Sequence, residues 1–560
     1  MKKLINDPRA VVREMLEGLV ALAPGQALLA EADVVLRAGL PDPAARPVAV
    51  LSGGGAGHEP AHAGYVGPGL LTAAVSGDVF TSPSTDAVLA ALRAAAGPAG
   101  ALLVVKNYTG DRLNFGLAAE LARAEGIPTE IVVVADDVAL RDTVPPERRR
   151  GIAGTVLVHK VAGAAAAGGL PLAEVAALAR EAAAALGTMG VALGACTVPA
   201  AGRPGFTLEE DAVELGLGIH GEQGVARAPM QPADALVAIL LEKIRDDLRL
   251  TAGERVALLV NGLGGTPPME LAIAARAALS ILRGAGLRVE RAWCGNYLTA
   301  IEMPGVSLSL LRLDDRRLAL LDAPAEAPAW TGTGQIPPRP AILAAAAEAP
   351  PAPAFAEGAS TPHLRGAVLR VAAALDAAEA RLTELDSATG DGDLGISMAR
   401  GAAALRGLPA SAFANPATCL EAVGQALRRA IAGSSGPFYA VGLLRAAREL
   451  AGDAPDARAW AAAFRAATAG VMELGGARAG DRTMLDALLP AAEAFEAATS
   501  AGQGLPAAWA AAVEAAAHGA QATAEMQPRL GRASYLGARA LGHQDAGAAA
   551  VLVWMRALAA

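Results

Sequence analysis

One stretch of this chain, from about Thr331 to Thr361, breaks the pattern of the sequence on either side of it. It reads TGTGQIPPRPAILAAAAEAPPAPAFAEGAST, in which large apolar residues have no regular spacing. This composition gives no obvious core and predicts a linker that is semi-stiff where prolines cluster. A chain of 560 residues is also too long for a single hydrophobic core. We therefore expect different domains before and after a linker at residues 331–361.

Before this linker, short β-branched apolar runs alternate with alanine-rich stretches that have helical spacing. The clearest runs are Val48–Leu51, Ala101–Lys106, Glu130–Ala135 and Arg255–Asn261. Such alternation is typical of α/β folds, which bind ligands in loops at the carboxyl ends of strands. The register changes near Leu250, after a helix expected at Ala233–Asp247. We therefore expect two α/β subdomains, residues 1–248 and 249–330.

After the linker, residues 362–560 contain almost no strand-like run. Segments rich in alanine and leucine have helical spacing, and turns such as AGSSGP and GGARAGDR interrupt them. This pattern predicts an all-helical domain. The expected fold class is therefore multidomain, with an α/β half followed by an all-α half.

Composition excludes several classes of function. The formal net charge of −9 shows no footprint for binding nucleic acid or anionic lipid. Gly, Pro or charged residues interrupt every long apolar stretch, so we expect no membrane insertion. The start, MKKLINDPRAVVREML, lacks the apolar core of a secretory signal. We expect a cytoplasmic protein.

The most informative motif is Asp386-Ser-Ala-Thr-Gly-Asp391-Gly-Asp393, which follows a helix expected to end near Leu385. Three carboxylates this close in sequence, with glycines that allow tight turns, repel one another unless cations lie between them. Hard oxygen ligands favour Mg²⁺, or alternatively Ca²⁺. The spacing does not match an EF-hand loop. The other interpretation is a solvated acidic turn that caps the next helix.

Several Gly- and Ser-rich turns accompany these aspartates in the helical half. They are Ala432–Pro437, Gly475–Met484, Gly531–Gly537 and Gly542–Gly547. Glycine and serine at helix starts present N–H groups and hydroxyls to phosphate, and the helix dipole adds attraction. Each turn alone is a weak signal, but together with the aspartates they indicate a nucleotide site at one end of a helical bundle. No Walker or kinase glycine loop is present.

In the first half, the informative residues are His58, Lys106, Asp111 and His220, all in predicted loops after strands. An isolated histidine is more often structural. The functional interpretation is that a neutral imidazole nitrogen of His220 attacks a substrate carbonyl. Asp111 is then a candidate base, and Lys106 or His58 a polarising group. The segment SGGGAGHEP looks like a phosphate loop but lacks the GxGxxG order.

Nearly the whole chain resembles the ATP-dependent dihydroxyacetone kinases, which fuse a substrate-binding half to a helical nucleotide-binding half. The matching segments are KKLINDP, LSGGGAGHEPAHAGYVGPGLLTAAVSGDVFTSP, VKNYTGDRLNFG, GACTVPAAG, GLGIHGEQG, LVNGLGGTP, DSATGDGDLG, GDRTMLDAL and GRASYLG. The resemblance implies two α/β subdomains followed by an antiparallel helical barrel that holds ATP with two magnesium ions. It also implies a small ketose or triose as substrate, and we expect a homodimer.

For the first half, the resemblance makes His220 the residue that captures the ketone as a covalent hemiaminal. His58 and Asp111 become acid/base candidates around the hydroxyl that accepts phosphate. The implied substrate-binding residues are Gly55, Ala56, Gly57, His58, Lys106, Asp111 and His220.

For the helical half, the resemblance makes Asp386, Asp391 and Asp393 the metal ligands. The implied nucleotide contacts are Leu394, Gly395, Ile396, Ser397, Ser434, Ser435, Gly475, Met484, Arg532, Asp545, Ala546 and Gly547. Two positions depart from the family pattern. Leu394 stands where relatives often have a polar residue such as His, and Ala546 replaces a proline that many relatives show.

The function implied is ATP-dependent phosphorylation of dihydroxyacetone (glycerone), with glyceraldehyde as a second substrate. One alternative is a kinase of a four-carbon ketose such as erythrulose, because the motifs do not set the depth of the pocket. Another is a non-catalytic ketone sensor whose nucleotide is permanently bound.

Overall fold

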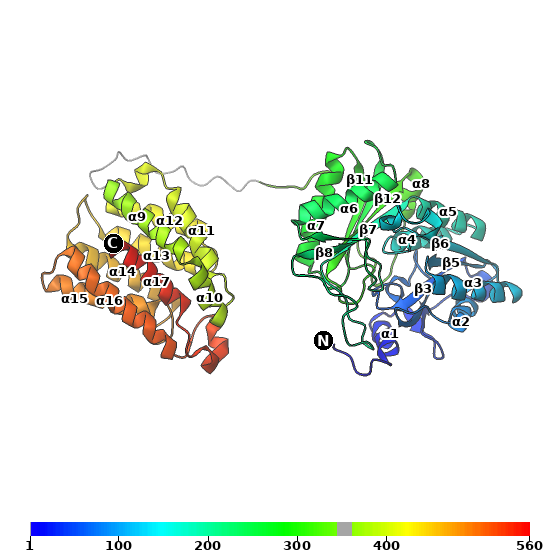
Figure 1. Ribbon diagram of the computed structural model, residues 1–560, viewed down its shortest axis with the longest axis horizontal. Helices are drawn as coiled ribbons and strands as arrows, with labels where there is room; N and C mark the ends of the chain where they lie inside the picture. Colours follow the sequence, from blue (N-terminus) through cyan, green and yellow to red (C-terminus); the bar gives the residue numbers. More distant parts are fainter. Residues whose placement is uncertain (1, 344–360, 560) are drawn as a thin grey trace. The chain divides into compact units, whose positions relative to one another are not determined.

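The computed structural model describes residues 2–343 and 361–559, in two compact units, Met1–Leu343 and Ala344–Ala560 (Figure 1). Residues 344–360 of the expected linker lie outside the described residues. The start of that linker belongs to the first unit. The carbonyl of Gly334 accepts a hydrogen bond from the N–H of Ala292 at 2.7 Å, and Gln335 forms an antiparallel bridge with Arg291. Residues after Thr331 therefore follow the edge of a sheet, because their backbone groups pair with its outer strand.

The first sheet has the strand order β1-β2-β4-β3-β5-β6. Its strands are β1 (Gln26–Leu28), β2 (Val34–Arg37), β3 (Ala49–Ala56), β4 (Ala73–Val79), β5 (Ala101–Lys106) and β6 (Thr129–Val134). From β3 to β6 the strands run parallel. The carboxyl ends of β4, β3 and β5 therefore lie side by side, where α/β folds place ligands.

The second sheet has the order β11-β10-β12-β7-β8-β9. Its strands are β7 (Leu186–Ala192), β8 (Ala212–Leu215), β9 (Ala226–Pro229), β10 (Arg255–Gly262), β11 (Arg288–Gly295) and β12 (Gly305–Leu313). β12 pairs antiparallel with both β10 and β7. The expected boundary between residues 248 and 249 therefore lies within this sheet rather than between the two sheets, because β12 joins strands from both sides of it.

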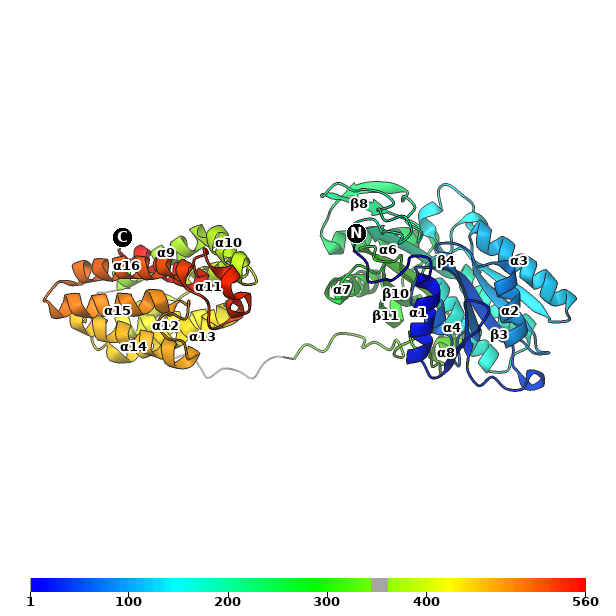
Figure 2. The same cartoon turned by 90° about the horizontal axis from the view of Figure 1, so that it is seen from below.

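Helices cover both sheets in layers. The helices of this unit are α1 (Val11–Leu22), α2 (Thr85–Ala95), α3 (Thr109–Ala124), α4 (Thr155–Ala167), α5 (Leu172–Ala184), α6 (Ala233–Asp247), α7 (Pro268–Gly284) and α8 (Asp315–Asp322). One core joins α2 and α3 to the first sheet, and another joins α6 and α7 to the second. A third core contains α4, α5 and strands of both sheets. Figures 1 and 2 show α2 and α3 on one side of this unit, α4 in the middle and α7 on the other side.

The second unit is helical throughout its described residues. Its α-helices are α9 (Thr361–Ala377), α10 (Glu379–Thr389), α11 (Leu394–Arg406), α12 (Pro416–Ala430), α13 (Ser435–Glu449), α14 (Ala457–Gly475), α15 (Leu485–Ser500), α16 (Leu505–Ala522) and α17 (Ala546–Ala559). Helices α11 to α17 pack in sequence, and α9 closes the ring between α17 and α11. The ring surrounds an apolar cavity of about 610 Å³. The expected fold class, an α/β half followed by a helical barrel, is confirmed.

A helix that crosses a bilayer must be both long and predominantly apolar. In residues 2–343 and 361–559, no helix is both long and apolar enough to cross a bilayer.

Candidate active site

Three carboxylates converge where α10 gives way to α11. One oxygen from each of Asp386, Asp391 and Asp393 lies within 4.8 Å of the others. Asp386 Oδ2 also accepts hydrogen bonds from the backbone N–H groups of Asp393 at 2.9 Å and Leu394 at 3.2 Å. Carboxylates this close repel one another unless a cation lies between them, and hard oxygen ligands suit magnesium. The donor set therefore fits a magnesium ion.

The helix before this cluster is longer than expected. α10 runs to Thr389, so the predicted end near Leu385 is wrong, because no helix-breaking residue comes before Gly390. Asp386 thus lies in the last turn of α10, where the partial negative charge of the helix terminus adds to the repulsion. Asp393 is the N-cap residue of α11. A bound cation would relieve the repulsion at the α10 terminus.

Leu394 to Ser397 form the first turn of α11. Ser397 is buried, whereas the Ile396 side chain is exposed. Gly395 allows α11 to approach α10 closely, because a Cβ there would lie 2.2 Å from the carbonyl of Glu379. This turn can therefore present backbone N–H groups beside the carboxylate cluster.

A second group of predicted nucleotide residues lies close to these carboxylates. Asp545 Oδ1 accepts the N–H of Ala548 at 2.8 Å and so caps α17. A Cβ on Gly547 would lie 3.1 Å from Asp545 Oδ1 and 3.5 Å from Met484 Cβ. Burial raises the pKa of Asp545 to about 6, and the nearby carboxylates Asp486 and Asp386 also raise it. Arg482 opposes these shifts, and Asp545 is therefore close enough to both Arg482 and Asp386 to interact with them electrostatically.

The remaining predicted nucleotide residues occupy other helix ends. Ser434 is the N-cap residue of α13, and Ser435 begins that helix. Gly475 ends α14 and lies against the ring of Phe438. Arg532 begins the 3₁₀ segment η7 (Arg532–Ala540), and its side chain is outside the described part of the structure.

In the first unit, the side chains of His58 and His220 pack against each other. Their ring centroids lie 4.9 Å apart, and both rings contact Phe80. His58 is fully buried, and its Nδ1 donates to the carbonyl of Thr299 at 2.8 Å. Burial, followed by the charges of His220 and Lys106, holds the pKa of His58 well below its usual value. His58 is therefore neutral, with a free electron pair on Nε2.

His220 lies on the loop between β8 and β9, and Glu222 holds it there. The backbone N–H of His220 donates to Glu222 Oε2 at 2.8 Å, and Nδ1 lies 3.4 Å from Oε1. Burial raises the pKa of Glu222, but the hydrogen bonds from His220 outweigh this and lower it to about 2. The edge of the Tyr108 ring packs on His220 with a centroid distance of 4.5 Å. A carboxylate at Nδ1 leaves Nε2 as the nitrogen directed away from Glu222.

Lys106 and Asp111 form a buried pair, and Lys106 is close enough to influence the pKa of His58. Lys106 Nζ lies 3.8 Å from Asp111 Oδ2 and donates to the carbonyl of Gly53 at 3.2 Å. Both residues were expected in loops, but Lys106 ends β5 and Asp111 lies in the first turn of α3. The difference arises because β5 and α3 are joined by only two residues. Burial lowers the pKa of Lys106, and Asp111 opposes this shift.

At the glycines expected to bind the substrate, the backbone lies very close to a neighbouring segment of the chain. Gly55 and Ala56 end β3, and Gly57 and His58 follow it. A Cβ on Gly55 would lie 2.5 Å from the N of Thr81. Gly57 has φ of +93°, a backbone conformation that favours glycine. These glycines let the β3 loop pack against the loop after β4, which holds Phe80.

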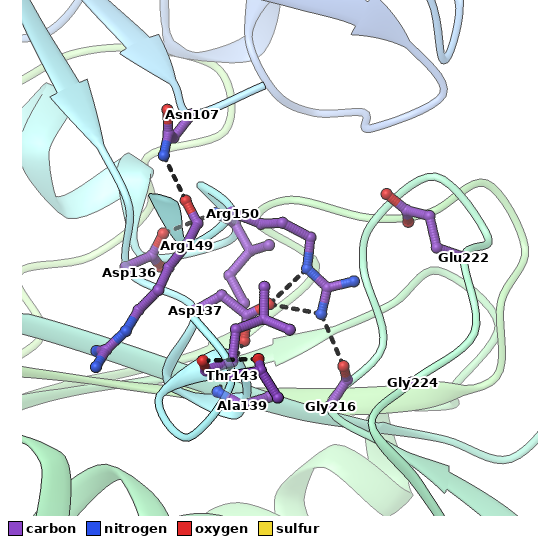
Figure 3. Close-up of polar contacts among 12 residues, drawn as sticks. Asn107, Asp136, Asp137, Ala139, Thr143, Arg149, Arg150, Gly216, Glu222 and Gly224 are labelled. Carbon is purple, nitrogen blue, oxygen red and sulfur yellow. Dashed lines mark hydrogen bonds and ion pairs between the residues drawn. The ribbon is translucent and has the colours of Figure 1, made fainter. Parts of the chain in front are cut away.

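A buried ion pair anchors the loop that carries His220 (Figure 3). Arg150 Nε donates to Asp137 Oδ2 at 2.7 Å, and Nη2 donates to the carbonyl of Gly216 at 2.8 Å. Figure 3 also shows Glu222 on the same loop, on the Arg150 side. Burial raises the pKa of Asp137 to about 6, although Arg150 opposes the shift. The ion pair is therefore complete above about pH 6 and is lost as the pH falls through that value.

We expect this titration to release the His220 loop. Hydrogen exchange measured by mass spectrometry on residues 216–225, corrected for intrinsic rates, should increase below about pH 6 in the wild type. Asp137→Asn should show the fast exchange at pH 7.5 already, because its neutral amide forms no ion pair with Arg150. The exposed Asp142→Asn, which loses only a contact to Arg141, is the control. Equal exchange in Asp137→Asn and wild type at pH 7.5 would contradict this anchoring role.

Sequence reasoning missed the residues that orient the two histidines. Phe80, Tyr108, Glu222 and Thr299 all contact His58 or His220. A signal existed for Glu222, which lies two residues after His220 in a glycine-flanked turn. None existed for Thr299, which is separated from His58 by 241 positions.

Comparison with known proteins shows the family of the chain. Residues 17–329 match the Dak1 domain, and residues 388–560 match the DAK2 domain. The triokinase/FMN cyclase of Mus musculus is 43% identical over 570 residues, which cover 100% of this chain and 98% of that protein. The D-erythrulose kinase of Mycolicibacterium smegmatis is 39% identical over 574 residues, with 100% and 98% covered.

A solved structure matches both halves as well. The crystal structure of the dihydroxyacetone kinase from C. freundii in complex with AMP-PNP and Mg²⁺ has a TM-score of 0.65 and 36% sequence identity. The match covers 100% of this chain and 99% of that one. The chain therefore belongs to the dihydroxyacetone kinase family and is a kinase.

Proposed function

We propose that this kinase uses ATP to phosphorylate dihydroxyacetone, which it holds as a hemiaminal on His220, and that glyceraldehyde is a second substrate. The observation that carries the proposal is the meeting of His58 and His220, 4.9 Å apart between ring centroids. His58 Nε2 is buried there without a hydrogen-bond partner among the described residues. A ligand that carries both a carbonyl and a hydroxyl would use both imidazoles.

Capture of the ketone needs one free imidazole nitrogen. His220 Nε2 attacks the carbonyl carbon, the C–N bond forms, and the π electrons move to oxygen. The alkoxide oxygen takes up a proton from solvent and the ring loses its Nδ1 proton to solvent, so the hemiaminal that results is neutral. Glu222, a carboxylate at Nδ1, stabilises the positive charge that develops on the ring. Glycerol has no carbonyl and should be a poor substrate.

Phosphoryl transfer also requires a base near the accepting hydroxyl. His58 donates from Nδ1 to Thr299, so its Nε2 can only accept a proton. Asp111 is the second candidate, and Lys106 lies beside its carboxylate. The base removes the proton of the substrate hydroxyl as its oxygen approaches the γ-phosphorus.

The helical half is proposed to hold the nucleotide. Asp386, Asp391 and Asp393 would bind magnesium, two ions in our proposal, and a metal bound there would neutralise charge on the triphosphate. The first turn of α11 and the turn at Asp545 to Gly547 would contact the phosphates through backbone N–H groups. The AMP-PNP and Mg²⁺ in the C. freundii structure support this proposal.

A coupled assay of ADP release tests the function directly. Purified full-length chain with ATP and Mg²⁺ would be offered dihydroxyacetone, D- and L-glyceraldehyde, D- and L-erythrulose and glycerol. We expect the highest kcat/KM with dihydroxyacetone and the lowest with glycerol. Absence of ADP release with every substrate would refute the kinase proposal and favour a ketone sensor, especially if bound nucleotide could not be exchanged.

A higher kcat/KM with erythrulose would identify a kinase of four-carbon ketoses instead. The name of the M. smegmatis relative, a D-erythrulose kinase, favours that alternative, because its sequence matches this chain from end to end. The histidine chemistry would be unchanged, since erythrulose also carries a ketone beside hydroxyls.

We also propose that the protein is a cytoplasmic homodimer. Three leucines at four-residue spacing on α3 are exposed, Leu113 by 68%, Leu117 by 54% and Leu121 by 38%. Such spacing places them on one helix face. The neighbouring β6 is an edge strand that exposes Val133 by 39%. An apolar helix face beside a free sheet edge suits a second copy of the chain.

Mutation of this face should change the oligomeric state. Light scattering should give twice the chain mass of 55.9 kDa for wild type. Leu117→Glu should give the single mass, because a carboxylate at the centre of the leucine row opposes burial. Leu22→Glu, at an exposed leucine of α1 outside that row, should remain dimeric. A dimer that persists in Leu117→Glu would place the interface elsewhere.

A further inference from the structure

Lys106 also contacts buried polar side chains other than Asp111. Ser52, His62 and Lys106 are all buried. Ser52 Oγ donates to the carbonyl of Val104 at 2.7 Å, and His62 Nδ1 lies 3.5 Å from Ser52 Oγ. Lys106 Nζ lies 2.9 Å from His62 Nε2. The proposed reaction uses neither Ser52 nor His62.

These contacts define the tautomer of His62. The only hydroxyl hydrogen of Ser52 is directed to Val104, so Ser52 Oγ accepts from His62. His62 Nδ1 therefore carries the hydrogen, and Nε2 carries an electron pair. An ammonium group has three donors and no acceptor, so Lys106 donates to that electron pair. Burial and the neighbouring Lys106 keep the pKa of His62 well below its usual value, which preserves this neutral form.

The other two N–H groups of Lys106 have equally defined neighbours. They are the carbonyl of Gly53 at 3.2 Å and Asp111 Oδ2 at 3.8 Å. Space around the ammonium is tight, because a Cβ on Gly54 would lie 2.3 Å from Nζ. The ammonium therefore has His62 Nε2 and the Gly53 carbonyl within hydrogen-bond distance, and the Asp111 carboxylate as a longer ionic contact.

We propose that His62 is a positioning residue for the kinase reaction. Its Nε2 accepts one N–H of Lys106 and so directs the remaining N–H groups toward the β3 glycine loop and Asp111. The link from Asp111 to catalysis rests on the proposed function. An N–H left unpaired in this buried site would cost the ammonium its favoured position, and Asp111 would lose its partner.

Three variants of the full chain test this role. His62→Leu removes the acceptor and should lower kcat by roughly 10- to 100-fold, the effect of one hydrogen bond to a charged group. His62→Gln, whose Oε1 can replace Nε2, should restore most of kcat. His159→Leu is the matched control, because His159 packs on His62 with a centroid distance of 5.1 Å and forms no hydrogen bond to Lys106 among the described contacts.

The pH profile separates positioning from a general loss of structure. In His62→Leu the charged form of Lys106 loses a hydrogen bond, so its pKa falls further. The alkaline limb of kcat should therefore move to lower pH in this variant and stay in place in His159→Leu. Ser52→Ala, which leaves the His62 tautomer unfixed, should shift the limb in the same direction by less. If His62→Leu does not fold, Ser52→Ala still decides, because a lower kcat with an unshifted alkaline limb in that variant would overturn the proposal.

Crystal structures of wild type and His62→Gln or Ser52→Ala give a readout that does not require activity. We expect Lys106 Nζ to keep its contacts to Gly53 and Asp111 in His62→Gln and to move in Ser52→Ala. If Nζ does not move in Ser52→Ala and the pH profile is also unchanged, the proposed positioning of Lys106 by Ser52 and His62 would be overturned. Absence of kinase activity in wild type would instead refute the proposed function, and the position of Nζ would still test the positioning of Lys106.

Discussion

Replacing His220 by alanine should lower kcat/KM for dihydroxyacetone by about 10³-fold, the order expected when a group that bonds to the substrate is lost. The reason is local to the first unit. Alanine has no nitrogen to attack the carbonyl, while Glu222, Tyr108 and Phe80 remain around the empty position. Binding of AMP-PNP with Mg²⁺, measured by calorimetry, should equal that of wild type, because the residues proposed to hold the nucleotide lie in the second unit.

The ratio of kcat/KM for dihydroxyacetone to that for glycerol is the sharper measurement. Wild type should prefer the ketone strongly, and His220→Ala should lose most of that preference, since only the ketone can bond to imidazole. His363→Ala, at an exposed histidine of α9, should leave the ratio unchanged. Retention of the wild-type preference by His220→Ala would rule out the hemiaminal and leave His220 as a group that only shapes the pocket.

The division into an α/β half and a helical half could be predicted because it depends on local periodicity. Strand order could not be predicted in the same way. Gly305 of β12 pairs with Ala192 of β7, and this pairing joins residues on both sides of position 248 into one sheet. A change of register near Leu250 marks a new strand, but it does not show which strand the new one will pair with.

The candidate site shows the same limit. His58, Lys106, Asp111 and His220 are identified by residue type beside glycine turns. In the structure His58 packs against His220, Lys106 pairs with Asp111, and Lys106 is close enough to influence the pKa of His58. The tautomer of His58 depends on Thr299, which is 241 positions away, so no local pattern could reveal that Nε2 accepts a proton. The predicted ends of elements were also wrong where the connecting loop is short. Lys106 was expected in a loop but is the last residue of β5. Site chemistry is thus more predictable from sequence than the hydrogen bonds that tune it.

The aspartate cluster gives the second large effect. Asp393→Asn should lower kcat/KM for ATP with Mg²⁺ by about 10²-fold or more, because charge on the triphosphate is then less well neutralised. The unfolding temperature of Asp393→Asn should not fall together with its activity. Without Mg²⁺, the variant should unfold at the same temperature as wild type or higher, because one of three carboxylates within 4.8 Å has been neutralised.

With Mg²⁺ the order should reverse. A ligand present at 100 times its Kd stabilises the folded state by about 2.7 kcal/mol, so Mg²⁺ should raise the unfolding temperature of wild type but not that of Asp393→Asn. Glu514→Gln, which neutralises an exposed carboxylate on α16, should respond to Mg²⁺ as wild type does. An equal response in Asp393→Asn would identify the cluster as a solvated acidic turn. A rise in unfolding temperature without Mg²⁺ and a loss of response with it together require the three carboxylates to be stabilised by a shared cation.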